Sequence, residues 1–172
     1  MSEEMKTKTF SILVCFVTAI HINAQKLDLF FGFSQNTPSL IKHIRKLILP
    51  SRASQTYNFT KTFKNEDRSQ FGQDETVLKL LNYKKNGIFI EAGAYDGEVH
   101  SNTLQLELNY NWTGILIEPN PENFDTMLTK HRKCHFLNAC LSTSNTVKEE
   151  YFDAAGKIMC VIGVCEAIEF RI

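Results

Sequence analysis

The sequence predicts an α/β fold in which helices flank a parallel sheet. Between residues 88 and 140, short apolar runs that suit buried strands alternate with helix-like segments, and this alternation is typical of parallel sheets with right-handed crossovers. The 172 residues, 43% of them hydrophobic, provide for one packed domain and a tail. The formal net charge is zero, so we expect no nucleic-acid partner.

The first 24 residues have the composition of a secretory signal. Residues 12–17 (ILVCFV) form an unbroken apolar run, and Ala24 is the small residue expected before a cleavage site. A membrane-spanning helix needs about 20 apolar residues, and this stretch is shorter. We predict a signal peptide over residues 1–24, with an uncleaved signal anchor as the alternative. A buried amphipathic helix is disfavoured because residues 12–17 have no polar face.

Two sequons would be candidates for N-glycosylation if the chain enters the secretory pathway. Asn58 begins the triplet N-F-T in a polar stretch, and Asn111 begins N-W-T in a predicted tight turn. We predict Asn58 as the better acceptor of the two. The cysteine spacings fit no zinc pattern, so we predict no metal site.

A basic segment, residues 25–65, follows the predicted signal. Residues 26–65 carry seven Lys or Arg against one Asp, whereas residues 66–125 carry four basic and eleven acidic side chains. This contrast predicts two different units with a boundary near residue 66.

Within the basic segment, Thr37 and Pro38 are expected to start an amphipathic helix with a hydroxyl cap, and Pro50 to end it. Such a helix either lies on a membrane surface or packs as a stem against its own domain, and we favour the stem. Residues 51–64 are predicted to form a polar linker.

The domain itself is predicted to begin with a helix that has Asp74 and Glu75 in its first turn and Gly87 as its left-handed stop. The elements expected next are strand 88–91, a helix capped by Ser101, strand 115–117, a helix starting at Asn120 and strand 135–140. Residues 147–152 and 158–164 are candidates for two further short strands.

Candidate site residues follow the first two strands of the domain. Ligands of such sheets bind beyond the carboxyl ends of the strands. Gly93 and Gly97 would let the backbone approach a ligand. Glu118, 27 residues after Glu91, would accept hydrogen bonds from both hydroxyls of a ribose. The alternative for both glutamates is a strand-end carboxylate that caps the following loop.

The ligand that this pattern favours carries no phosphates. The spacing G-x-x-x-G departs from the dinucleotide pattern G-x-G-x-x-G. Asp96 and Glu98 are expected to repel a pyrophosphate. S-adenosylmethionine therefore fits better than NAD.

Four motifs in order resemble the FkbM-type methyltransferase domain and, within that family, the Star-like secretory-pathway proteins of arthropods. They are residues 69–74 (SQFGQD), 89–97 (FIEAGAYDG), 117–124 (IEPNPENF) and 138–142 (NACLS). The resemblance implies a partial, Rossmann-like methyltransferase fold. Residues 66–156 would supply its N-terminal half, and residues 157–172 a divergent hydrophobic tail.

The resemblance also implies site residues. The implied contacts to S-adenosylmethionine come from Glu91, Gly93, Ala94, Gly97, Glu118, Asn138 and Ala139. Tyr95 and Asp96 depart from the small or amide residues more usual in the cofactor loop. We assign no catalytic residue; His100, after the loop, is only a weak candidate base.

Star-like proteins imply trafficking in the endoplasmic reticulum, Golgi and endosomes, with membrane cargo or trafficking proteins as partners. We therefore expect a membrane-associated or secreted protein of this pathway that acts in vesicle-mediated transport rather than in catalysis. Membrane association would come from the N-terminal segment or the basic helix. The alternatives are an active S-adenosylmethionine-dependent O-methyltransferase and a secreted binding module with a vestigial pocket.

Overall fold

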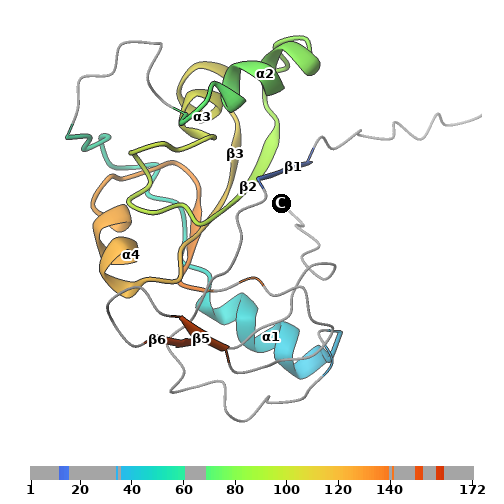
Figure 1. Ribbon diagram of the computed structural model, residues 1–172, viewed down its shortest axis with the longest axis vertical. Helices are drawn as coiled ribbons and strands as arrows, with labels where there is room; N and C mark the ends of the chain where they lie inside the picture. The colour runs from blue at the N-terminus through green and yellow to red at the C-terminus, as the bar shows by residue number, and fades with distance from the viewer. Residues whose placement is uncertain are drawn as a thin grey trace, which may run out of the picture.

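The computed structural model describes residues 12–15, 34, 36–60, 69–139, 141, 150–152 and 158–160. Along the chain, Figure 1 shows β1 (Ile12–Cys15), α1 (Pro38–Leu47), α2 (Gln73–Leu80), β2 (Ile88–Ala92), α3 (Leu104–Tyr110), β3 (Thr113–Ile117), α4 (Pro121–Leu128), β4 (His135–Leu137), β5 (Glu150–Phe152) and β6 (Ile158–Cys160). Most of the predicted segments 1–24 and 157–172 therefore lies outside the described residues.

Four strands form one parallel sheet in the order β1-β2-β3-β4. Helices connect its members from β2 onward: α3 joins β2 to β3, and α4 joins β3 to β4. The α/β class with a parallel sheet and flanking helices is thus confirmed. The outermost strand, β1, lies inside the segment predicted to be a secretory signal.

The two strands expected after residue 147 exist but do not extend the parallel sheet. β5 and β6 pair with each other, antiparallel, in a separate two-stranded sheet. Residues 153–157 connect them. A parallel crossover needs a dozen or more residues, so a connection this short allows only the antiparallel pairing.

The core lies between the sheet and its helices. It contains Phe89 of β2, Leu116 of β3 and Phe136 of β4, together with Leu106 of α3 and Met127 of α4. These side chains are buried because apolar residues of the strands face apolar stripes of the helices.

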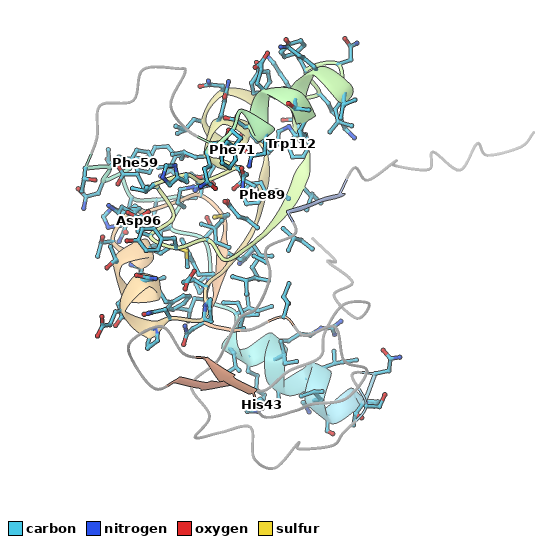
Figure 2. The ribbon with its side chains drawn as sticks, in the orientation of Figure 1. His43, Phe59, Phe71, Phe89, Asp96 and Trp112 are labelled. Atoms are coloured by element: carbon cyan, nitrogen blue, oxygen red, sulfur yellow. The ribbon has the colours of Figure 1, made fainter. Side chains whose placement is uncertain are left out.

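Trp112, 2% exposed, explains the glycine at position 87. The prediction that Gly87 is a left-handed helix stop is wrong, because the left-handed residues after α2 are Asn82, Tyr83 and Asn86. A Cβ at Gly87 would lie 2.4 Å from Cδ2 of Trp112. Gly87 is therefore required by the packing of the indole ring, which Figure 2 shows close to α2.

Helix α1 begins as predicted, with Pro38 in its first turn, but Thr37 makes no side-chain capping bond. Leu40 and Ile44 are buried, and the basic residues Lys42, Arg45 and Lys46 are exposed. Two residues of the apolar stripe are thus covered within the protein, and Ile41, Leu47 and Ile48 are partly buried. Within the described ranges, none of the helices combines the length and apolarity needed to cross a bilayer.

Residues 49–60, expected to lie mostly in a linker, are bound along the edge of β4. Leu49 exchanges two backbone hydrogen bonds with Phe136, at 2.8 and 3.1 Å. Farther along, the N–H of Asn58 donates to the carbonyl of Lys130 at 3.1 Å. The predicted polar linker, residues 51–64, is therefore bound to the domain over its described part, residues 51–60. Backbone groups at the sheet edge need partners, and this segment supplies them.

Candidate functional site

The loop after β2 and the carboxylate after β3 meet at the same edge of the sheet. The N–H of Tyr95 donates to Oε2 of Glu118 at 2.7 Å. The N–H of Gly93 donates to the carbonyl of Ile117 at 2.8 Å. Two parts of the chain predicted to face a common ligand are therefore in direct contact.

Glu118 is buried, with 5% of its surface exposed. Its Oε1 accepts the N–H of Asn120 at 2.9 Å. Burial raises the pKa of Glu118, and hydrogen bonds from the backbone N–H groups of Asn120 and Tyr95 partly oppose this. No basic side chain of the described residues forms an ion pair with it. A carboxylate has about four acceptor positions. The N–H groups of Tyr95 and Asn120 and the side chain of Asn123 occupy three of those of Glu118, so about one stays open.

The end of β4 joins the same edge. Nδ2 of Asn138 donates to the carbonyl of Glu118 at 2.7 Å and to that of Pro119 at 3.1 Å. Ala139 is 1% exposed. Asn138 and Ala139 therefore lie at the same edge of the sheet as Glu118. The amide of Asn138 is used to hold the turn that carries Glu118.

The loop owes its shape to three left-handed residues, Gly93 (φ 70°), Tyr95 (φ 52°) and Gly97 (φ 72°). A bulky residue with positive φ is uncommon and costs on the order of 1–3 kcal/mol. Tyr95 is nonetheless half exposed. At Gly97 a Cβ would lie 2.7 Å from Cγ of Met127, so this glycine is required by packing on α4 and not only by a ligand.

The backbone donors of the loop are largely used within the chain. The N–H of Gly97 donates to the carbonyl of Ala94 at 2.8 Å. The N–H groups of Glu98 and Val99 donate to Oδ1 of Asp96 at 2.9 and 2.7 Å. A phosphate-binding loop presents such donors to its ligand, and in this structure these three N–H groups donate to the chain's own oxygens instead.

Glu91, the other candidate carboxylate, is 3% exposed and accepts three hydrogen bonds. It accepts the hydroxyl of Ser101 and the N–H of Asn102, both at 2.9 Å, and the hydroxyl of Thr103. The prediction that Ser101 caps α3 is wrong, since the capping position is Thr103 and carries no side-chain capping bond. A cofactor contact from Glu91 would require it to exchange one of these bonds.

Sequence reasoning missed the two buried ion pairs behind the loop. In the first, Nζ of Lys130 lies 2.6 Å from Oε2 of Glu98. Thr60 of the 49–60 segment also donates to Glu98, from its N–H at 3.0 Å and its hydroxyl at 2.9 Å. Glu98 is 0% exposed. Its expected repulsion of a pyrophosphate is therefore wrong, because Lys130 neutralises its charge.

In the second pair, Nε of Arg132 donates to Oε2 of Glu107 at 2.9 Å. Nη1 also donates to the carbonyl of Gly97 at 2.6 Å and to the hydroxyl of Ser101 at 3.2 Å. Burial is the largest single influence and lowers the pKa of Arg132, but the charges of Glu107, Cys134 and Glu91 and the hydrogen bond to Glu107 together outweigh it, so the pKa is raised. Arg132 thus ties the lead-in to β4 to the loop and to α3.

The sequence does contain a signal for these cations. From Lys130 to Phe136 every second residue is buried, with Arg132 and Cys134 between them. This is the period of an extended strand with one buried face, although β4 is assigned only from His135. This alternation of buried residues was not recognised in the sequence, because two of the buried residues, Lys130 and Arg132, are charged.

His100 is exposed and has a left-handed backbone with φ 58°. Burial raises the pKa of the Cys134 thiol well above its usual value, which makes it a poor nucleophile. Over the part of the chain that the structure describes, no cluster of three metal-ligating side chains occurs.

Both sequon asparagines are exposed. Nδ2 of Asn58 donates to the carbonyl of Thr129 at 3.1 Å, and Nδ2 of Asn111 donates to Oδ1 of Asn86 at 2.6 Å. Asn111 is the left-handed C-cap of α3, with φ 55°. Figure 2 shows Phe59, the middle residue of the first sequon, on the same side of the molecule as Asp96 of the loop.

Comparisons of the chain with family models, with curated proteins and with solved structures find no match. The family resemblance consequently rests on the four motifs of the sequence.

Proposed function

We propose that this chain is a Star-like secretory-pathway protein with a partial FkbM-type methyltransferase fold, and that it acts in ER-to-Golgi and endosomal trafficking of membrane cargo rather than in catalysis. The observation that carries this proposal is that the polar groups at the strand ends bind one another. Glu91 holds the segment before α3, Glu98 pairs with Lys130, and Asn138 holds the turn at Glu118. Such a site favours a scaffold over an enzyme.

S-adenosylmethionine remains the cofactor that this edge would hold. Glu118 would accept a ribose hydroxyl, Gly93 and Ala94 would line the ligand with backbone, and Ala139 would lie beside the adenine. Bound S-adenosylmethionine would supply an electrophilic methyl group. A buried carboxylate with free acceptor capacity supports this fit.

The decisive experiment separates trafficking from methyl transfer. Cells that lack the protein are complemented with the wild type, with Glu118→Gln or with the matched surface change Glu122→Gln. Export of membrane cargo is then followed by glycan maturation in a pulse–chase assay. We expect all three proteins to restore export, because scaffolding does not require the ribose carboxylate. Failure of Glu118→Gln alone, in a protein shown to be folded, would contradict the non-catalytic proposal.

The alternative is an active O-methyltransferase, favoured by the acceptor capacity of Glu118. It requires transfer of a labelled methyl group from S-adenosylmethionine to a hydroxyl of a glycan or small molecule. It also requires that Glu118→Gln abolish cofactor binding in calorimetric titration while Glu122→Gln preserves it. Transfer above background by the wild type would overturn the trafficking proposal in its non-catalytic form.

Secretory targeting is tested independently by translation in the presence of microsomes. We expect a glycosidase-sensitive mass increase that decreases stepwise in Asn58→Gln and in Asn111→Gln. A chain that stays unmodified and accessible to protease would argue against entry into the pathway.

A further inference from the structure

The outer strand of the parallel sheet comes from the segment predicted to be a secretory signal. β1 pairs in parallel with β2, with Ile12 opposite Ile88 and Cys15 opposite Glu91. Figure 1 shows β1 lying against β2 and separated along the sequence from every other strand of the sheet. The same four residues cannot pair with β2 while they lie in a membrane or after a signal peptidase has removed them.

The hydrogen bonds between β2 and β3 show which backbone groups of β2 are left to face β1. The N–H of Gly93 donates to the carbonyl of Ile117, and the N–H of Thr113 donates to the carbonyl of Gly87. Backbone groups along a strand alternate between its two neighbours. The groups of Gly87 and Gly93 therefore face β3, and those of Ile88 and Ile90 face β1.

Loss of β1 would leave these groups unpaired in an apolar strand. β2 reads I-F-I-E-A, and Phe89 is 0% exposed. Buried backbone groups are almost always paired, and an unpaired edge of an apolar strand is a template for another strand. The edge of β2 thus requires a strand from one source or another.

We propose that β1 is an exchangeable edge strand, and that β2, once residues 12–15 have left, binds an extended, uncharged, apolar segment of a partner protein in parallel. The segment that occupies this edge in the structure defines the chemistry of the partner: I-L-V-C, without charge or proline. Main-chain hydrogen bonds would provide the affinity, as in other cases of strand addition. The need for a strand from a partner protein rests on the proposed secretory targeting. The ability of β1 to leave the edge of β2 and be replaced does not.

Two proline variants of the full chain test the exchange. Leu13 lies opposite Phe89, so by the alternation its N–H points toward β2, whereas that of Val14 points away. Leu13→Pro therefore removes a donor to β2, and Val14→Pro is the matched control because proline is tolerated where the N–H faces outward. In Leu13→Pro we expect hydrogen exchange to accelerate at Ile88 and Ile90 but not at Phe89, whose N–H faces β3.

The probe for the partner is a synthetic peptide of residues 10–17 with serine at position 15. We expect it to restore protection at Ile88 and Ile90 in Leu13→Pro and to bind this variant about tenfold more tightly than Val14→Pro, whose edge stays occupied. Unchanged exchange in Leu13→Pro, loss of protection at Phe89 as well, or a peptide without effect would each overturn the proposal. Since none of these measurements involves a cell or a cofactor, their failure is distinguishable from failure of secretory targeting or trafficking.

Discussion

Replacing Glu98 by Gln should destabilise the protein strongly, because it removes one charge of a buried pair. Glu98 is 0% exposed and Lys130 is 3% exposed. Their charged atoms lie 2.6 Å apart, and the next acidic oxygen to Lys130, Oδ2 of Asp96, is 3.9 Å away. The variant leaves the Lys130 ammonium in a buried site, where this distant carboxylate is its remaining acidic partner among the described residues.

The magnitude follows from these contacts. Removing one partner of a buried pair costs about 3–5 kcal/mol, because the remaining charge is uncompensated. For a chain of this size each kcal/mol corresponds to a shift of about 2–4 °C in Tm. We therefore expect the Tm of Glu98→Gln to fall by about 6–20 °C.

Two further variants separate burial from charge. Glu75 and Lys79 form an exposed pair at 3.5 Å, with side chains 41% and 65% exposed. Glu75→Gln should change the free energy of unfolding by less than about 1 kcal/mol. Adding Lys130→Met to Glu98→Gln should recover at least half of the loss, since no uncompensated charge remains.

Chemical denaturation followed by fluorescence provides the measurement. Trp112, the single tryptophan, is 2% exposed in the core, so its emission reports unfolding directly. A Glu98→Gln variant within about 1 kcal/mol of the wild type would refute the reasoning, because the pair would then be worth no more than a surface pair.

Three other changes test single features of the fold by the same denaturation assay. Gly87→Ala places a Cβ 2.4 Å from Trp112 and should cost about 1–3 kcal/mol by overpacking; an unchanged midpoint would contradict this. Asn120→Ala removes the side-chain acceptor for Glu122 N–H and Asn123 N–H and should cost about 1 kcal/mol. Burial raises the pKa of Glu118 from its usual 4.5, so the stability it contributes is present below that value and is lost as the pH rises through the folded pKa. Across a series from pH 4 to 7, the wild type should therefore lose stability relative to Glu118→Gln, and parallel curves would contradict this sign.

Local patterns predicted most of the elements that carry the site. The apolar runs at 88–91 and 115–117 became β2 and β3, and the Asn120-Pro121 start became the capped N-terminus of α4. Each of these signals lies within a few neighbouring residues. The expected proximity of the loop to Glu118 also followed, because parallel strands end at one edge.

The features that the sequence did not predict depend on partners far along the chain. Buried Arg132 forms an ion pair with a glutamate 25 residues away in the sequence, and buried Lys130 with one 32 residues away. A run of basic residues normally indicates a solvated surface, so no local rule identifies such pairs. Gly87 was misinterpreted for the same reason, since the indole that it accommodates belongs to position 112.

The bound 49–60 segment has a practical consequence for making this protein. A recombinant fragment that starts at the predicted boundary, residue 66, would lack Thr60, which donates to Glu98, and Leu49, which pairs with Phe136. In the truncated product the buried carboxylate of Glu98 would lose the hydrogen bonds from Thr60, and the edge of β4 would lose its backbone partner. We expect such a fragment to precipitate or be degraded during expression, whereas a version that begins before β1 and so keeps both segments should remain in solution.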